Sequence, residues 1–219
     1  MNKFIFFYSP IYDYYKNHII KNIGNFFDIE SILIDDIPNK TNSWHTFCGG
    51  VSIKIELIIQ KIKENLNSFI IFSDATIFIN SNNATLLSNF FDSYKNNDLC
   101  FADNTGYGDH YNIGLILIKC NSNTLSFFEN VLNDLIINKG WDQGVVNRHL
   151  YNTSLKIGVF DKEQIMCGDN FNQIYRDKYL IFKSFIGHTP NLITNYNSRL
   201  DKFHNAGLIS DDEYNNNKK

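Results

Sequence analysis

The segment that decides the fold is Phe69-Ile70-Ile71-Phe72-Ser73-Asp74, a run of four apolar residues closed by a serine and an aspartate. A short apolar run that ends in polar residues is typical of a buried strand. Apolar residues recur at helical spacing just before it, from Val51 to Leu66, which predicts an amphipathic helix. A helix that leads into a buried strand indicates an α/β protein.

The same alternation extends along the chain in both directions. Further strands are predicted over residues 3–8, 29–34, 99–102 and 114–119, and further helices over 11–25, 84–94, 125–137 and 141–150. Residues 39–50 are polar and rich in turn formers, so a functional loop is predicted there. Alternating strands and helices favour a three-layer α/β sandwich around a mostly parallel sheet.

We expect a single catalytic-sized domain over residues 1–194, because no linker rich in Pro, Gly or Ser and no internal repeat divides the chain. Residues 195–219 are expected to form a C-terminal helix and then a polar, frayed tail. The chain has 219 residues, of which 43% are hydrophobic and 15% aromatic. That is enough apolar material for a substantial core.

The charge balance argues against one class of partner. The 20 Lys and Arg and the 23 Asp and Glu leave a formal net charge of -3. Because phosphate contacts dominate nucleic-acid affinity, a nucleic-acid binder is normally basic, and we expect no nucleic-acid partner. An anionic ligand must therefore be held by a local group of cations.

Cysteine usage and hydropathy indicate a reduced, soluble protein. The chain has no C-x-x-C motif among its cysteines, which are Cys48, Cys100, Cys120 and Cys167. We therefore expect neither a zinc ribbon nor a disulfide framework. No stretch approaches the roughly 20 apolar residues that span a bilayer, and the short apolar run at the start lacks a signal-peptide cleavage site. We expect a cytoplasmic protein without a transmembrane segment.

Acidic side chains follow two of the predicted strands, at the edge where α/β proteins bind ligands. Asp74 ends the strand quoted above and Asp103 follows residues 99–102, whereas Asn112 and Gly114 come before a strand. One aspartate at a strand end is as often a helix cap or a turn former as a functional group. The two together favour a ligand site.

The stretch Ser73-Asp74-Ala75-Thr76 is compatible with two chemistries. A phosphatase of the haloacid-dehalogenase type needs a second aspartate where Thr76 stands, so nucleophile and general acid cannot both be supplied. The metal-binding D-x-D of nucleotide-sugar transferases holds a divalent ion that bridges the donor diphosphate. Thr76 weakens that motif too, since a neutral hydroxyl binds Mn²⁺ or Mg²⁺ less well than a carboxylate does.

Later motifs favour the second chemistry. In chain order, the motifs are Phe72-Ser73-Asp74-Ala75-Thr76, Asp103, Asn112-Ile113-Gly114, Trp141-Asp142-Gln143-Gly144-Val145-Val146-Asn147 and Gly187-His188. On these the chain resembles the GT-A nucleotide-diphospho-sugar transferases, especially the retaining galactosyl-, glucosyl- and xylosyl-type families. The W-D-Q-x-x-x-N string is the most specific element, and the incomplete D-x-D is the weakest. The resemblance implies a GT-A, Rossmann-like fold and transfer of a sugar from a UDP-sugar donor to an acceptor hydroxyl.

The resemblance implies a metal site made by Asp74, Thr76 and the distant His188, with Mn²⁺ (or Mg²⁺) as the cofactor. A histidine nitrogen together with carboxylate and diphosphate oxygens suits Mn²⁺. Without the resemblance, His188 would be interpreted as a core histidine, because apolar residues precede it.

The resemblance also implies a donor site. It places Tyr8 and Ser9 against the nucleotide base and Lys54 near the donor sugar and diphosphate. The residues around the transferred sugar would be Asp103, Asn112, Gly114 and Trp141, and the catalytic pair facing the anomeric carbon would be Asp142 and Gln143. Taken without the resemblance, Lys54 is a solvated helix residue, Tyr8 packs on the sheet, and Trp141 packs at a helix start.

Two other functions remain open at this point. One is a catalytically weakened sugar-nucleotide or glycan-binding protein that keeps the fold but has lost metal affinity through Thr76; it predicts donor binding without turnover. The other is a nucleotidyltransferase, which needs a Gly-rich basic loop after the first strand, and residues 9–13 contain neither glycine nor a cation.

The acceptor cannot be read from the sequence. A glycan, a protein and a small molecule are all compatible with it, because acceptor sites are built from variable loops such as residues 39–50 and 105–111. A second copy of the chain, in a homo-oligomer, is counted among the expected partners.

Overall fold

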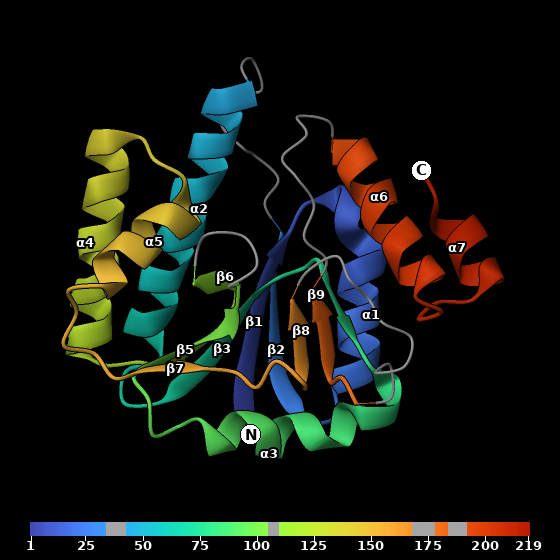
Figure 1. The fold of residues 1–219 in the computed structure, drawn as a ribbon, viewed down its shortest axis with the longest axis horizontal. Helices are drawn as coiled ribbons and strands as arrows, with labels where there is room; N and C mark the ends of the chain where they lie inside the picture. Colours follow the sequence, from blue (N-terminus) through green and yellow to red (C-terminus); the bar gives the residue numbers. More distant parts are fainter. Residues whose placement is uncertain (34–42, 105–109, 168–177, 184–191) are drawn as a thin grey trace.

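The structure, a computed structural model, describes residues 1–33, 43–104, 110–167, 178–183 and 192–219, with the backbone alone for residues 43–52 and 192. A six-stranded sheet lies at its centre (Figure 1), in the order β2-β1-β3-β6-β5-β7. Its strands are β1 (Asn2–Tyr8), β2 (Phe27–Leu33), β3 (Phe69–Asp74), β5 (Leu99–Asp103), β6 (Tyr111–Lys119) and β7 (Ile157–Val159). Strand β6 runs antiparallel to both of its neighbours, β3 and β5, and the other pairs are parallel.

Helices cover both faces of this sheet, which confirms the three-layer α/β sandwich around a mostly parallel sheet (Figure 1). One face carries α2 (Ser43–Glu64), α4 (Ser122–Asn138) and α5 (Asp142–Leu150); the other carries α1 (Asp13–Ile23) and α3 (Leu87–Ser93), with the short helices η1 (Pro10–Tyr12) and η2 (Ser81–Leu86) nearby. On the first face, Ile58 of α2 and Phe128 of α4 share a buried cluster with Phe72 of β3. On the second face, Phe91 of α3 is buried with Phe4 of β1.

A second, three-stranded sheet stands beside the first and was not predicted. It has the order β4-β9-β8 and comprises β4 (Ile77–Ile79), β9 (Ile181–Lys183) and β8 (Ile165–Cys167). Strands of three residues are too short for the alternation that marks a strand in sequence. The pairing of β4 with β9 sets Ile77 opposite Lys183, which brings a distant part of the chain beside the end of β3.

The C-terminal residues form two helices, α6 (Leu192–Asn205) and α7 (Asp211–Asn217), where one helix and a frayed tail were expected. Helix α6 packs on α1 through aromatic rings, with Tyr196 and Tyr15 edge to face at 5.3 Å. Helix α7 is capped by Ser210, whose side chain accepts from the backbone N–H of Glu213. The domain boundary at residue 194 stays a prediction.

Two other expectations differ from the structure. Residues 43–50 were predicted as loop, yet α2 already begins at Ser43. Gly49 and Gly50 each cost a helix about 1 kcal/mol relative to alanine, but extending an existing helix is favourable enough to absorb that cost. Asn112 and Gly114 lie inside β6 and not before it. The rest of the predicted loops, residues 39–42 and 105–109, lies outside the described residues, as does residue 34, the predicted end of a strand.

The structure describes the side chains of three of the four cysteines, and the helices whose length and hydropathy bear on membrane insertion. Among the described cysteines, Cys100, Cys120 and Cys167 are free thiols. Burial raises the pKa of Cys100 and of Cys120, so both stay protonated at neutral pH. None of the helices in the described part of the chain is long and apolar enough to cross a membrane.

His18 predicts how the stability of the fold changes with pH. Its ring on α1 stacks on Phe78 of β4 at 3.8 Å, and its Nε2 accepts from the backbone N–H of Ile79. Burial lowers the pKa of His18 to about 4, below the ordinary value of 6.5. A histidine held neutral in the fold stabilises it fully above the unfolded-state pKa and loses that contribution as the pH falls from 6.5 to 4.

We therefore expect the free energy of unfolding to fall by about 2 kcal/mol between pH 7 and pH 4.5 on account of His18. Urea denaturation at both pH values measures the fall. The variant His18→Gln, which cannot take up a proton, should show a correspondingly smaller fall, since the other titrating groups remain. An equal fall in the variant and in the wild type would contradict the assignment to His18.

Candidate functional site

Asp74 ends β3 at the carboxyl edge of the sheet, and each of its oxygens is paired with a lysine. Oδ1 lies 2.8 Å from Nζ of Lys54, and Oδ2 lies 2.7 Å from Nζ of Lys183. Both lysines are only 6% exposed, whereas the Asp74 side chain is 26% exposed. Buried lysines are rare unless they are paired, so this three-residue group, the lysine–aspartate cluster, is a built feature with one side open to solvent.

Three different elements bring the lysine–aspartate cluster together. Lys54 projects from α2. Lys183 ends β9, and β9 pairs with β4, the strand that follows Asp74 in the chain. Gly114 of β6 closes the cluster from a third side. A Cβ added at Gly114 would lie 1.7 Å from Nζ of Lys183 and 2.6 Å from Oδ2 of Asp74. The glycine of the N-x-G motif therefore leaves the space that the ammonium and carboxylate groups fill.

A second carboxylate, that of Asp142, extends the cluster toward α5. Its Oδ2 lies 3.9 Å from Nζ of Lys54, and its Oδ1 accepts from the backbone N–H of Gln143 at 2.8 Å. Asp142 is 7% exposed and stands in the first turn of α5, where the helix dipole favours negative charge. Lys54 thus lies between two acids from different elements.

The electrostatics of the two acids differ. Burial alone would raise the pKa of Asp74, but the charges of Lys183 and Lys54 outweigh it and hold the pKa well below its usual range. For Asp142, burial raises the pKa and the more distant Lys54 offsets only part of the rise. Neighbouring acids whose pKa values are pushed apart are typical of active sites. Asp142 is the acid of this pair that takes up a proton more readily.

The two lysines also differ from each other. Burial would lower the pKa of Lys54, but the charges of Asp74 and Asp142 raise it above its ordinary value. Lys183 has Asp74 alone as its acidic ion-pair partner among the described residues, so burial dominates and lowers its pKa. The ammonium of Lys54 is therefore the more firmly held charge.

The two later sequence motifs bind each other. The side-chain oxygen of Asn147 accepts from the backbone N–H of Tyr111 at 3.0 Å, and its amide nitrogen donates to the carbonyls of Tyr111 and Gln143, each at 2.8 Å. Oε1 of Gln143 accepts from the N–H of Ile113 at 3.4 Å, and Oδ1 of Asn112 accepts from the N–H of Gly114 at 2.8 Å. These bonds fix the start of α5 to the start of β6.

The remaining predicted donor-site residues stand at the same edge. Tyr8 ends β1 and Ser9 follows it directly, and Phe7 of this strand is in register with Asp74. The Tyr8 ring is half-buried and has Nζ of Lys16 at 4.9 Å above it. Asp103 ends β5 and is half-buried, and half-buried Trp141 directly precedes α5. Their roles toward a donor stay predictions.

The predicted metal ligands are only partly placed. Thr76 is half-buried between β3 and β4, and Gly187 and His188 lie outside the described residues. In the described part of the chain, no group of three His, Cys, Asp or Glu side chains is arranged to hold a metal ion. Asp74, the one carboxylate of the incomplete D-x-D, already has an ammonium group on each oxygen. The described residues therefore do not fit a divalent cation.

Lys183 is the site residue that sequence reasoning missed. It follows the apolar residues Leu180-Ile181-Phe182, so it ends a short buried strand just as Asp74 does. The strand-end rule that selects Asp74, applied to cations in a chain of negative net charge, would have selected Lys183.

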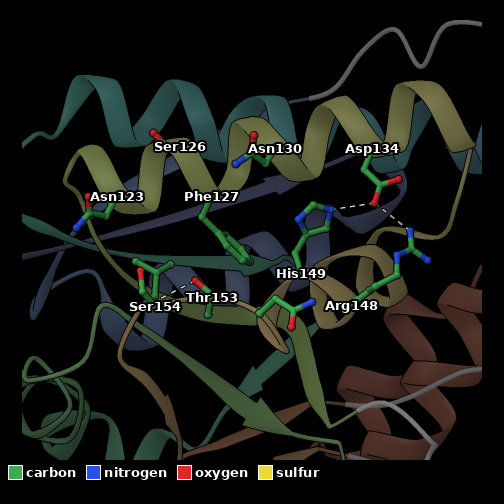
Figure 2. A pocket seen from close by; sticks show the side chains of 11 residues that line it. Asn123, Ser126, Phe127, Asn130, Asp134, Arg148, His149, Thr153 and Ser154 are labelled. Carbon is green, nitrogen blue, oxygen red and sulfur yellow. Dashed lines mark hydrogen bonds and ion pairs between the residues drawn. The ribbon is translucent and has the colours of Figure 1, made fainter.

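A separate polar pocket of about 590 Å³ lies between α4, the end of α5 and the segment before β7 (Figure 2). At its wall Asp134 lies 2.9 Å from Nε2 of His149 and 3.1 Å from the guanidinium of Arg148. None of the residues of the lysine–aspartate cluster lines it. The start of α5 thus lies at the lysine–aspartate cluster, and its end lines this separate pocket.

The comparison with family models decides the class of protein. The model described as nucleotide-diphospho-sugar transferase matches residues 54–202, which include Lys54, Asp74, Asp142 and Lys183. The chain belongs to the nucleotide-diphospho-sugar transferases. It is therefore a glycosyltransferase, and its family implies a sugar-nucleotide donor.

Solved structures agree on the fold of this transferase. A glycosyltransferase involved in the glycosylation of the major capsid of PBCV-1 matches with a TM-score of 0.65 and 10% identity over 94% of this chain and 100% of that one. The bifunctional glycosyltransferase WbbM matches with a TM-score of 0.55 and 11% identity over 93% of this chain and 50% of that one. GlyE of Streptococcus pneumoniae TIGR4 matches with a TM-score of 0.53 and 12% identity over 95% and 64%. At these identities the likeness shows the fold alone, and the search of curated proteins gave no match.

Asn147 should matter for stability more than for chemistry. The variant Asn147→Ala removes three hydrogen bonds, one buried and two partly buried, and leaves the backbone groups of Tyr111 without that partner. We expect the free energy of unfolding to fall by about 2 to 4 kcal/mol. Urea denaturation measures it, with Asn152→Ala as the matched control because Asn152 is exposed. A variant within the error of the wild type would show that α5 is not fixed through Asn147.

Proposed function

We propose that this transferase moves a sugar from a UDP-sugar to an acceptor hydroxyl and retains the configuration at the anomeric carbon. The observation that supports it best is the convergence of Lys54, Asp74 and Asp142 at one sheet edge, with ion-pair distances of 2.8 and 3.9 Å. A cation beside a diphosphate stabilises the charge that leaves with it, and a carboxylate beside a sugar stabilises the positive charge that develops on the ring. The resemblance to UDP-sugar users in the W-D-Q-x-x-x-N string supports the choice of UDP.

The proposed donor lies with its diphosphate at Lys54 and its sugar toward Asp142 and Gln143. In the transfer step the acceptor oxygen bonds to the anomeric carbon, and the bond from that carbon to the diphosphate oxygen breaks. The electron pair leaves on UDP, and the proton of the acceptor hydroxyl passes to the departing diphosphate oxygen. Asp142 and the carbonyl of the Gln143 side chain stabilise the positive charge that develops on the sugar ring.

Further residues would complete the donor site. Asp103 and Asn112 end and begin neighbouring strands at the same edge, and their carboxylate and amide are suited to sugar hydroxyls. Tyr8 offers an aromatic face and Ser9 a hydroxyl at the end of β1, which suits a uracil base. Mn²⁺ or Mg²⁺ was predicted as cofactor, but the described residues do not fit it, and no step here uses a metal.

The test is a donor-hydrolysis screen of UDP- and GDP-sugars with the wild type and with Asp142→Asn. We expect UDP-sugar hydrolysis in the wild type, and a fall in kcat of about 100-fold in the variant because the charge that faces the anomeric carbon is lost. KM for the donor should change by less than about threefold, since that charge acts mainly in the transition state. Asp28→Asn is the matched control, because Asp28 is exposed at the opposite end of β2.

The stereochemical part has its own measurement. Proton NMR of the freshly released sugar should show the anomer of the donor, and release of the other anomer would contradict retention. Donor binding without any turnover would instead support the sugar-nucleotide-binding protein considered from the sequence. A wild type that binds no UDP- or GDP-sugar would overturn the proposed function.

A further inference from the structure

The lysine–aspartate cluster occupies the place where the D-x-D motif of the family would hold its ion. On this geometry we infer that Lys54 and Lys183 neutralise the donor diphosphate in place of a divalent cation. Asp74 then positions the two ammonium groups and does not ligate a metal. The inference rests on the proposed function, because it concerns the donor of the same site.

The pairing is enforced by the fold and is not a chance surface contact. Lys54 and Lys183 come from α2 and β9, and both are 6% exposed. By contrast, the surface pair of Lys63 and Glu129 has side chains that are 54% and 47% exposed. A long cation that is enclosed by its surroundings cannot swing into solvent, so a divalent cation that took the place of the lysines on the Asp74 oxygens would have to displace two buried ammonium groups.

Gly114 is the strongest sign that the lysine belongs in this position. A Cβ there would meet Nζ and Cε of Lys183 at 1.7 and 2.2 Å. The backbone of β6 thus passes so close that the ammonium of Lys183 can take this position only because residue 114 has no side chain. Gly114 of the N-x-G motif and Lys183 therefore fit each other in shape.

The charge balance of the cluster suits a diphosphate. Two ammonium groups and one carboxylate leave one net positive charge in the lysine–aspartate cluster, and the second acid, Asp142, lies 3.9 Å from Nζ of Lys54 on the side assigned to the sugar. Each ammonium has three N–H donors, and its pairing with Asp74 takes only one of them. The N–H donors that Asp74, and for Lys54 also Asp142, do not take can bond to phosphate oxygens, with which charged hydrogen bonds are strong.

Thr76 fits the same interpretation. A metal site loses affinity when its second acid becomes a hydroxyl, because hard cations select anionic oxygens. Asp74 already holds both lysines and Asp142 lies near Lys54, so a further carboxylate at position 76 would leave this group of charges negative. The residue that looked like a defect in the D-x-D motif is therefore the one expected beside two lysines.

The role in catalysis follows from where charge develops. As the bond between the anomeric carbon and the diphosphate oxygen breaks, the electron pair moves onto UDP, and preorganised ammonium groups stabilise that charge without rearrangement. Lys54 and Lys183 act here on the leaving group. The proton from the acceptor hydroxyl goes to UDP as described above, and no further co-reactant is needed.

The first measurement uses Mn²⁺ alone as the probe. Electron paramagnetic resonance of Mn²⁺ titrated with the whole chain should show no bound fraction that depends on Asp74, and Asp74→Asn should give the same curve as the wild type. Binding of Mn²⁺ that disappears in Asp74→Asn would overturn the inference, whether or not any donor is turned over.

The second measurement follows UDP by calorimetry and UDP-sugar hydrolysis by product release, each with EDTA and with Mn²⁺. We expect both to be the same in the two conditions to within about twofold, since no metal contributes to the leaving group. Hydrolysis that is abolished by EDTA and restored by Mn²⁺ would overturn the inference and leave the proposed function standing. Failure to bind UDP or any sugar nucleotide in either condition would overturn both.

Variants separate charge from position. Lys183→Met removes one ammonium and should weaken UDP binding by about tenfold or more, with no rescue by Mn²⁺. Gly114→Ala keeps both charges but displaces Lys183, and it should weaken UDP binding to a similar extent. Lys63→Met, which removes an exposed lysine of the same helix as Lys54, is the control and should bind UDP like the wild type.

Thermal unfolding of each variant shows whether it is folded. If Lys183→Met fails to fold, Gly114→Ala carries the test, since the far end of a lysine side chain can shift to admit one methyl group. Unchanged UDP affinity in a folded variant of either kind would overturn the role of Lys183.

Discussion

Two buried ammonium groups share one carboxylate at the carboxyl edge of β3, and the surrounding elements depend on that pairing. Burying an isolated charge costs several kcal/mol, and a buried ion pair is tolerated only when its geometry recovers that cost. Here the carboxylate of Asp74 meets Lys54 at 2.8 Å and Lys183 at 2.7 Å. Helix α2, through its apolar packing on the sheet, and strand β9, through its pairing with β4, bring these two cations to the end of β3. Without Asp74 both lysines would be buried without this partner, so the pairing serves the fold as well as the site.

The site depends also on strand β6, which runs in the opposite direction to its neighbours. In a fully parallel sheet the beginning of each strand lies at the edge away from the ligand site, but β6 is antiparallel to β3 and β5. Its first residues, Asn112 and Gly114, therefore stand beside the last residues of β3. Asn147 ties α5 to the same strand, so that Asp142 is presented at the same edge. One change of strand direction brings two motifs that are about thirty positions apart into one site.

Much of this could be predicted from the sequence, because the signals are local. The apolar run that ends at Asp74 and the helical spacing from Val51 to Leu66 gave the layers of the sandwich and the edge where the site lies. The three-residue strands β4, β8 and β9 carry no periodic signal, and without them Lys183 has no visible connection to Asp74. The start of α2 at Ser43 was missed because glycines at positions 49 and 50 suggest a turn when a segment is judged alone. The short strands, the position of Lys183 and the start of α2 depend on tertiary contacts, which leave no local signal in the sequence.

The incomplete D-x-D motif is also hard to interpret from the sequence alone. A D-x-D pattern is judged by counting acids, and by that count Thr76 is a loss. The physical requirement at a diphosphate, however, is positive charge held at a fixed place, and carboxylates serve it only indirectly, by holding a cation. A cation carried by the chain itself needs fewer acids than a bound ion does. What matters is the positive charge that the ligand meets, and not the number of acids in the motif. By that measure Lys54 and Lys183, held by Asp74, supply what the motif lacks.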